Sequence, residues 1–337
     1  MSVQRDARIL NRIGLGLWTV RSMAQWPRHP VGGFSELVDD ALLAQELGFH
    51  SIWSAEHRIW YDGWCPAPLL ALAHVAGATD RLRLGTAVLL ASQHDPISLA
   101  RTAATLDRVS GGRLDLGIGL GHRDAEFDTL GLRRDRRGRM MDRALELMPR
   151  VWAGEYGDAP PVQPGGPAIW MGGMAPRVLE RAVAGNYSLL LPQTLSAGRI
   201  GAVIEDVRAR GWSATAGAMR DLWIEDDPGR AAEMRRRLEQ GFTEEAGWWV
   251  LQGRRAFDAP ELLDRQLHRV SDAALIGSAD EVAEGLRALL HAGVEFLCLR
   301  INIDIADHSE LREQMRRVAA ELPPRLADAP VATGAPG

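Results

Sequence analysis

Short apolar runs alternate with amphipathic stretches along most of the chain. We interpret the apolar runs as strands, and the stretches with apolar residues at helical spacing as helices. The expected strands cover residues 13–18, 50–54, 82–90, 113–118, 168–171, 187–191, 216–225 and 296–303. The expected helices cover residues 34–47, 66–78, 96–109, 135–152, 176–184, 196–210, 228–240, 279–291 and 309–322.

This alternation predicts an α/β fold with a parallel sheet, because strands separated by helices pair in parallel through crossovers. Eight such strands predict a closed (β/α)8 TIM barrel, and residues 1–322 then form a single domain. The alternative is an open, doubly wound sheet, which carries a glycine fingerprint after its first strand. Here the first strand is followed by Thr19, Val20 and Arg21, which favours the barrel.

Two segments interrupt the alternation. Residues 241–270 lie between the seventh helix and the last βα pair and contain Trp248, Trp249 and Phe257. We interpret them as an insertion, either a mobile lid at the barrel mouth or an extra helix on the outside. Residues 323–337 are rich in Pro, Ala and Gly, and we expect them to form a disordered tail.

The composition excludes several functions. The formal net charge of −5 gives no basic footprint for nucleic acid and no attraction to a membrane surface. All 39 residues counted as Lys+Arg are arginine, which excludes enzymes that need a Schiff-base lysine or a P-loop lysine. Only two cysteines occur, residues 1–12 contain no apolar leader, and no apolar run is long enough to span a bilayer. We therefore expect a cytoplasmic protein.

Candidate chemistry lies where the expected strands end, because barrel enzymes form their active site at the C-terminal ends of the strands. Glu56 and His57 follow the second strand, and a histidine here can transfer a proton near neutral pH. The alternative is a structural histidine that is bonded to nearby backbone groups. Five tryptophans could line an apolar substrate pocket or pack on the outside of the barrel: Trp18, Trp60, Trp64, Trp248 and Trp249.

Two glycine-rich turns, after the fourth and fifth strands, are candidates for binding a phosphate. Backbone N–H groups at the start of a helix bind an anion, and an arginine adds a bidentate contact. The alternative is that these glycines serve only the steric needs of tight turns. The candidate residues are Gly119, Gly121, His122, Arg123, Gly172, Gly173, Met174, Ala175 and Arg177.

Metal-dependent and sugar hydrolysis are both disfavoured. The sequence has no His-x-His after the first strand and no His-Glu-x-x-His, so we expect no metal site. Glu56 and Glu225 lie near strand ends, but the separation of their carboxyl groups, on which glycosidase chemistry depends, does not follow from the sequence.

Several of these segments together resemble the bacterial luciferase-like flavin oxidoreductases. The strongest matching motifs are Arg81-Leu-Arg-Leu-Gly-Thr-Ala-Val-Leu-Leu, His94-Asp-Pro, Ser110-Gly-Gly-Arg, Leu116-Gly-Ile-Gly and Glu126-Phe. The similarity extends over roughly residues 13–305 and leaves out 241–270. One departure is Gly119, which stands where luciferase has a reactive cysteine.

The resemblance implies a barrel that binds reduced FMN or the deazaflavin F420. The ring would lie over the third strand at Thr86, where the family often has a non-proline cis peptide, here between Ala87 and Val88. Trp18 and the two glycine-rich turns would complete the cofactor site, and the turns would hold the phosphate. His57, with Glu56 beside it, matches the catalytic histidine of luciferase. The family also suggests a homodimer formed through helices of the first half.

Three functions stay open at this point. The first is a monooxygenase that takes reduced FMN from a separate flavin reductase and uses O₂ on a small organic or natural-product substrate. The second is an F420-dependent reductase or dehydrogenase that transfers hydride. The third, a minor alternative, is a flavin-binding protein without turnover. The pair of Glu56 and His57 favours the FMN-dependent monooxygenase.

Overall fold

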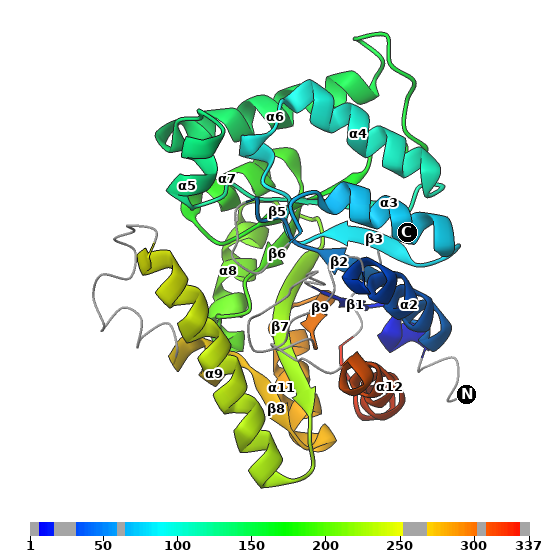
Figure 1. The fold of residues 1–337 in the computed structure, drawn as a ribbon, viewed down its shortest axis with the longest axis vertical. Helices are drawn as coiled ribbons and strands as arrows, with labels where there is room; N and C mark the ends of the chain where they lie inside the picture. The colour runs from blue at the N-terminus through cyan, green and yellow to red at the C-terminus, as the bar shows by residue number, and fades with distance from the viewer. Residues whose placement is uncertain (1–6, 17–31, 59–64, 252–267, 302–307, 331–337) are drawn as a thin grey trace. The chain divides into compact units, whose positions relative to one another are not determined.

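The computed structural model describes residues 7–16, 32–58, 65–251, 268–301 and 308–330, and for 244–251 only the backbone (Figure 1). The strands are β1 (Ile13–Leu15), β2 (Ser51–Ser54), β3 (Arg83–Thr86), β4 (Leu114–Ile118), β5 (Ala168–Gly172), β6 (Ser188–Leu191), β7 (Ala216–Ile224), β8 (Leu275–Gly277) and β9 (Phe296–Arg300). The helices include α2 (Gly32–Leu47), α3 (Pro68–Ala78), α4 (Pro96–Val109), α5 (Asp124–Thr129), α6 (Arg137–Trp152), α7 (Pro176–Gly185), α8 (Ala197–Ala209), α9 (Pro228–Leu251), α11 (Ala279–His291) and α12 (His308–Arg325). Two short 3₁₀ helices are η1 (Ala91–Gln93) and η2 (Arg134–Arg136).

The strand order confirms the predicted (β/α)8 TIM barrel. Hydrogen-bonded neighbours follow the order β6-β5-β4-β3-β2-β1-β9-β7, and β7 pairs with β6 to close the ring. Each strand pairing with a described register is parallel. The additional strand β8 pairs with the end of β7, at Leu222–Ile224. The sequence pattern did not reveal β8, because three residues are too few to show a period.

The chain divides into two compact units. The first, here called the β2–β5 unit, contains residues 17–45 and 51–173, and the second, the β6–β9 unit, contains residues 1–16, 46–50 and 174–337. Each is described by itself below.

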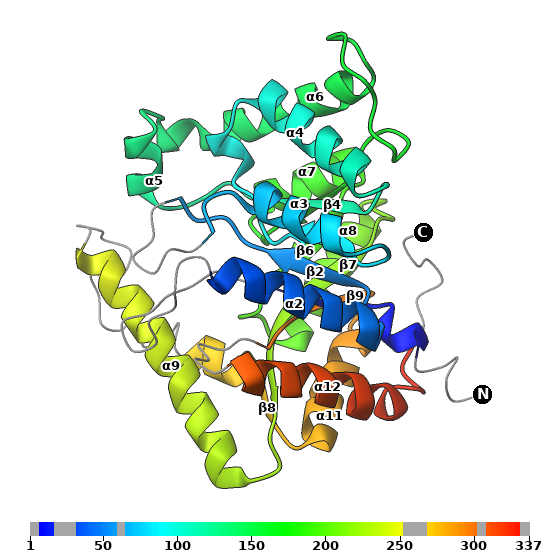
Figure 2. The same cartoon turned by 45° about the vertical axis from the view of Figure 1, so that its right-hand side comes forward.

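In the β2–β5 unit, local sequence signals place the helices. α4 begins where it was predicted, because the Asp95 carboxylate accepts a hydrogen bond from the Ser98 N–H at 2.8 Å and Pro96 occupies the first helical position. The indole N–H of Trp152, at the end of α6, donates to the carbonyl of Ala100 on α4 at 2.9 Å. α6 therefore lies against α4, as Figure 2 also shows.

β3 ends at Thr86, whereas the apolar run predicted a strand up to residue 90. The chain leaves the strand at a cis peptide bond between Ala87 and Val88. Beyond this bond, the Leu89 N–H donates to the Gly117 carbonyl at 2.8 Å, and the Gly119 N–H donates to the Leu89 carbonyl at 2.8 Å. The apolar residues after Thr86 therefore stay bonded to the β4 side without forming a regular strand.

In the β6–β9 unit, α9 is longer than the expected helix over 228–240 and takes up the first residues of the expected insertion. Apolar side chains of α9, among them Met234 and Leu238, form a buried cluster with Trp223 and Ile276. This cluster holds α9 against the end of β7 and against β8. Residues 252–267 of the insertion lie outside the described residues, so its role as a lid stays a prediction.

The last helix, α12, also extends beyond its expected end, and the expected disorder does not begin at residue 323. Leu322 and Leu326 are fully buried, and the Gln314 amide exchanges two hydrogen bonds with the backbone of Ile224. Burial of these apolar side chains thus keeps the chain ordered beyond residue 322 despite its Pro-rich composition. Residues 331–337 lie outside the described residues. Among the helices that the structure describes, none is long and apolar enough to cross a membrane.

Candidate active site

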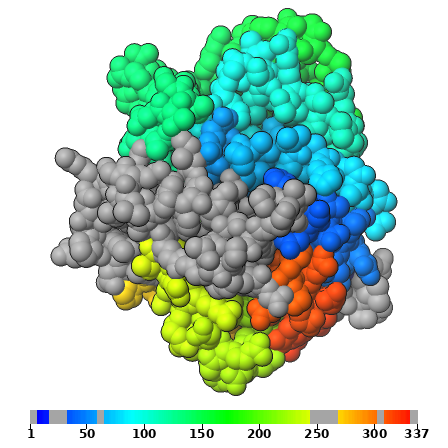
Figure 3. Space-filling model, viewed as in Figure 1, coloured from blue at the N-terminus to red at the C-terminus, as the bar shows by residue number. Residues whose placement is uncertain are grey.

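The candidate active site lies in the β2–β5 unit, at the ends of three neighbouring strands. Residues 56–58 follow β2, and residues 87–94 follow β3. Glu126 lies on α5, which follows β4 and forms part of an exposed green lobe in Figure 3. The C-terminal ends of the strands are where barrel enzymes carry their chemistry. The sequence predicted this location from the order of strands alone.

Backbone hydrogen bonds fix the cis peptide bond between Ala87 and Val88, which the family resemblance implied. The Ala87 N–H donates to the Ser54 carbonyl at 2.8 Å, and the Glu56 N–H donates to the Val88 carbonyl at 3.2 Å. The Thr86 hydroxyl donates to the Gly117 carbonyl at 2.6 Å. The segment is therefore tied both to the end of β2 and to β4.

Two of the predicted cofactor-binding glycines flank the Val88 side chain. A Cβ on Gly119 would lie 2.5 Å from Cγ2 of Val88, and a Cβ on Gly172 would lie 2.5 Å from Cγ1. Both positions therefore need glycine so that Val88 can fit between them. Gly121 has a φ of +68°, a backbone conformation that favours glycine. These observations give the glycines a steric role, and their contact with a phosphate stays a prediction.

His57 is held by a buried carboxylate. Its Nδ1 lies 3.2 Å from Oε1 of Glu126, and the same oxygen accepts from the Arg58 N–H at 3.2 Å and from the Arg123 guanidinium at 3.3 Å. Burial raises the pKa of Glu126, but the hydrogen bond from His57 and the charges of His57 and Arg123 outweigh it. The pKa of Glu126 is therefore lowered from its ordinary value, and Glu126 is a carboxylate at neutral pH.

This carboxylate determines the tautomer of His57. An ionised glutamate only accepts hydrogen bonds, so we assign a proton to Nδ1 of His57. Nε2 is then the ring atom that can transfer a proton. The ring of His122 lies edge-on to His57, with a centroid separation of 6.4 Å. The His122 side chain is partly exposed. Desolvation by the surrounding protein, together with repulsion from a charged His57, lowers the pKa of His122 to about 4, so His122 is neutral at neutral pH.

The predicted catalytic residue Glu56 has a different environment. Its side chain is fully buried, and it accepts from the Leu90 N–H at 2.7 Å and from Nε of Arg58 at 3.1 Å. Nε2 of His94 lies 2.9 Å from its Oε1. Glu56 therefore fixes the segment after the cis peptide bond, and its direct part in catalysis stays a prediction.

The other predicted cofactor residues are distributed over both units. Arg123, in the β2–β5 unit, is 1% exposed, so its guanidinium is buried against Glu126. Met174, Ala175 and Arg177 belong to the β6–β9 unit, where Arg177 lies in the first turn of α7 and pairs with Glu180 at 2.6 Å. Gly173 has a φ of +118°. The tryptophans at positions 18, 60 and 64, and the side chains at 248 and 249, lie outside the described residues.

Four residues of the cluster were not predicted as site residues. Glu126 and His94 stood within the motifs that carry the family resemblance, but no local pattern assigned them a role. Arg58 directly follows the predicted pair, and Gln93 directly precedes His94. Contacts within the cluster join residues up to 69 positions apart in the sequence. Only the fold brings these residues together.

These residues fit a flavin-type ring. Among the described side chains, Oε1 of Gln93 is buried without a hydrogen-bond partner, although buried polar atoms are usually satisfied. The ring system of a flavin or deazaflavin carries an N–H group that can donate to such an oxygen. Within the described residues, no group of three or more His, Cys, Asp or Glu side chains could hold a metal ion.

Comparison with known proteins identifies the family. The model of the luciferase-like monooxygenase family matches residues 15–295, and the chain belongs to this family. It is similar to the oxygenase component of a flavin-dependent trigonelline monooxygenase from Acinetobacter baylyi, with 31% identity over 165 residues, 44% of this chain and 46% of the relative. It is also similar to an F420-dependent hydroxymycolic acid dehydrogenase from Mycobacterium tuberculosis, with 34% identity over 126 residues, 35% of each chain. The matches thus span less than half of these relatives.

Solved structures show the same fold over most of the chain. The monooxygenase RslO1 from Streptomyces bottropensis has a TM-score of 0.76 at 24% identity, covering 93% of this chain and 99% of its own. The FMN complex of the oxygenating constituent of 3,6-diketocamphane monooxygenase from Pseudomonas putida has a TM-score of 0.71 at 20% identity, covering 93% and 98%. The family and the fold together define a class of oxidoreductases that comprises flavin-dependent monooxygenases and has F420-dependent relatives.

Proposed function

We propose that this chain is the oxygenase of a two-component monooxygenase, which takes reduced FMN from a separate flavin reductase and oxidises a small organic substrate with O₂. Membership of the luciferase-like monooxygenase family supports an oxygenase, and the relative described as an oxygenase component supports a separate reductase. The observation that carries the proposal is the His57–Glu126 pair at the strand ends. His57 directly follows Glu56, whose N–H donates to the Val88 carbonyl.

Residues around the cis peptide bond would hold the ring. Ala87 and Val88 offer an apolar support, and Oε1 of Gln93 offers an acceptor for a ring N–H. When bound, reduced FMN would supply two electrons to O₂, so that one oxygen atom enters the substrate and the other leaves as water. Ala87 and Val88 are fixed by hydrogen bonds before any ligand binds, so little ordering is required there.

His57 would move the proton that this reaction requires. Glu126 holds the proton on Nδ1 of the ring and stabilises the positive charge when Nε2 is also protonated. Nε2 can therefore give a proton to, or take one from, the reacting oxygen or the substrate. Neutral His122 adds no charge beside the ring at neutral pH.

An F420-dependent dehydrogenase is the second candidate, because one relative at 34% identity uses that cofactor. The same apolar support would hold the deazaflavin ring, and His57 would exchange the proton of a substrate hydroxyl while hydride passes to or from the ring. O₂ has no productive part in that reaction, which makes oxygen consumption the measurement that separates the two candidates.

A homodimer also stays a proposal. Large apolar side chains are exposed on helices of the first half: Leu42 on α2, Leu70 on α3 and Val109 on α4. The family resemblance, which suggests a dimer through helices of the first half, supports this proposal, and these side chains would lie in the interface.

The test is to titrate the purified protein, without oxygen, with FMN, reduced FMN and F420, and then to follow O₂ uptake after mixing the complexes with oxygenated buffer. We expect the protein to prefer reduced FMN and its complex to consume O₂. A chemical reductant or an unrelated flavin reductase can supply reduced FMN. Tight binding of F420 together with no consumption of O₂ by the FMN complex would overturn the monooxygenase in favour of the dehydrogenase.

A further inference from the structure

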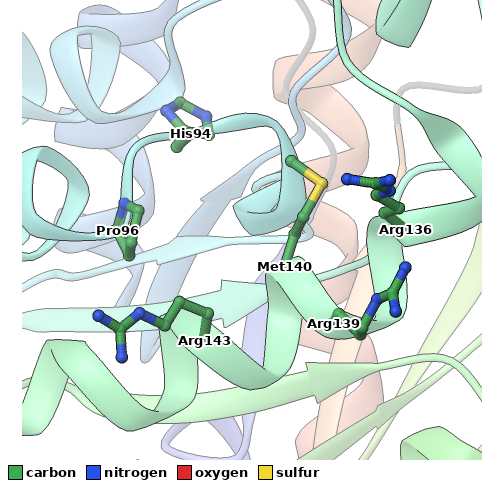
Figure 4. Close-up of a pocket in the computed structure, with 6 residues that line it drawn as sticks. All are labelled: His94, Pro96, Arg136, Arg139, Met140 and Arg143. Carbon is green, nitrogen blue, oxygen red and sulfur yellow. The ribbon is translucent and has the colours of Figure 1, made fainter.

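The β2–β5 unit has a cavity of about 390 Å³ where the start of α4 faces α6. His94 and Pro96 line it from the α4 side, and Arg136, Arg139, Met140 and Arg143 line it from the α6 side (Figure 4). In this view the guanidinium groups of Arg136 and Arg139 lie on one side of Met140 and that of Arg143 on the other. The cavity therefore combines three guanidinium groups and an imidazole with two apolar side chains.

The positive charge of this cavity is only partly neutralised. Within the described part of the chain, Arg136 and Arg139 form no ion pair, and Arg143 pairs with Glu146 at 2.9 Å. Other exposed arginines nearby are paired: Arg133 pairs with Asp135 at 2.6 Å, and Arg150 pairs with Glu155 at 2.7 Å. Arg136 and Arg139, which are also exposed, have no carboxylate within ion-pair distance among the described residues, in a chain whose net charge is −5.

We infer that this cavity is a second binding site, which takes a small ligand with a multiply charged oxyanion, either a phosphate or a polycarboxylate. Guanidinium groups are planar forks that bind the oxygens of carboxylate and phosphate in pairs. The volume lies at the lower end of the range of about 300–1,000 Å³ that is usual for small-molecule sites. Met140 and Pro96 can contact the apolar part of such a ligand.

This site is distinct from the His57–Glu126 pair but is joined to the same cluster. His94 lines the cavity, and its Nε2 lies 2.9 Å from Oε1 of Glu56. Glu56 in turn accepts a hydrogen bond from the N–H of Leu90, in the segment after the cis peptide bond. A ligand that contacts His94 therefore contacts a residue that helps to fix this segment, although the inference does not depend on the reaction proposed above.

The test is calorimetric titration of the full-length protein, free of flavin, with pyrophosphate and separately with citrate, at an ionic strength kept constant with sodium chloride. The informative variant is the double substitution Arg136→Gln with Arg139→Gln. Its matched control is Arg150→Gln, which removes an exposed arginine of the same helix outside the cavity. Circular dichroism of each variant checks that the fold is intact, and flavin binding by each is measured in parallel.

We expect saturable binding of one ligand per chain in the wild type and in Arg150→Gln, and at least about 10-fold weaker binding in the double variant, because two of three guanidinium groups are removed. Tighter binding of pyrophosphate would indicate a phosphate ligand, and tighter binding of citrate a polycarboxylate. Absence of saturable binding by either probe, or equal affinity in the double variant and the wild type, would overturn the inference. Flavin binding is expected to be the same in all variants. If the anion probes fail to bind, the inference about the cavity is overturned and the proposed function is unaffected.

Discussion

In the β2–β5 unit two buried glutamates, Glu126 and Glu56, each hold a histidine, but their surroundings differ. Glu126 holds His57 at 3.2 Å, and its other close donors are the Arg58 N–H and the Arg123 guanidinium. Glu56 holds His94 at 2.9 Å and also accepts a backbone hydrogen bond from Leu90. The His57 ring has a second histidine at its edge, whereas the His94 ring lines a basic cavity.

The two carboxylate–histidine pairs thus differ in what else the carboxylate holds. The hydrogen bond from the Leu90 N–H ties the Glu56 carboxylate to the loop after β3. Loss of this bond would change the position of that loop. The bond of Glu126 to this loop is longer, from the Gln93 side chain at 3.5 Å, and Glu126 also holds the ring of His57. We therefore propose proton transfer for the His57–Glu126 pair and a structural role for the His94–Glu56 pair, and three measurements can break this proposal.

The largest effect is expected when the two histidines are removed one at a time. His57→Ala should lower turnover by roughly 10²- to 10⁴-fold, the usual scale of a general acid or base, while binding of the reduced cofactor stays near that of the wild type. His94→Ala should lower turnover by less than about 10-fold, because it only loosens the loop. Single-turnover kinetics with the preferred cofactor provides the measurement. Equal losses in the two variants would remove the distinction between the pairs.

A smaller effect is expected for Glu126→Gln, which should lower turnover by about 10- to 100-fold, because the amide can no longer stabilise the charged imidazole ring. Glu126→Asp should restore part of the rate, because it keeps a carboxylate that can pair with the His57 ring. Single-turnover kinetics gives the rates of both variants. Equal rates in Glu126→Gln and Glu126→Asp would mean that the charge of Glu126 has no part in the reaction.

The smallest effect concerns stability in acid. The pKa of Glu126 is lowered in the folded chain, so its contribution to the free energy of unfolding is fully present above the unfolded pKa of roughly 4.3 and is lost as the pH falls through the folded pKa. Urea unfolding of the wild type and Glu126→Gln should therefore show a difference that narrows on acidification. Glu146→Gln, an exposed glutamate on α6, is the control. A constant difference between wild type and Glu126→Gln would contradict a lowered pKa.

The sequence alone predicted the parts of this protein that depend on local pattern. The alternation of apolar runs and amphipathic stretches was sufficient for the barrel, because helical and extended periods are properties of short windows. α4 runs over the predicted residues from Pro96 to Val109, and α11 over the predicted residues from Ala279 to His291. His57 was predicted as a site residue because it lies just beyond a predicted strand, where barrel enzymes carry their chemistry, and its catalytic role stays a prediction.

Only the tertiary structure decided which residues act with His57 and which glycines are sterically required. Glu126 and His57 are 69 residues apart, and no period or motif joins them until β2 and β4 lie in one sheet. Gly119 and Gly172 flank one valine that the sequence places far from both. β8 and the end of α12 were missed for the same reason: their residues are stabilised by packing against distant parts of the chain, and such packing leaves no regular pattern in the residues themselves.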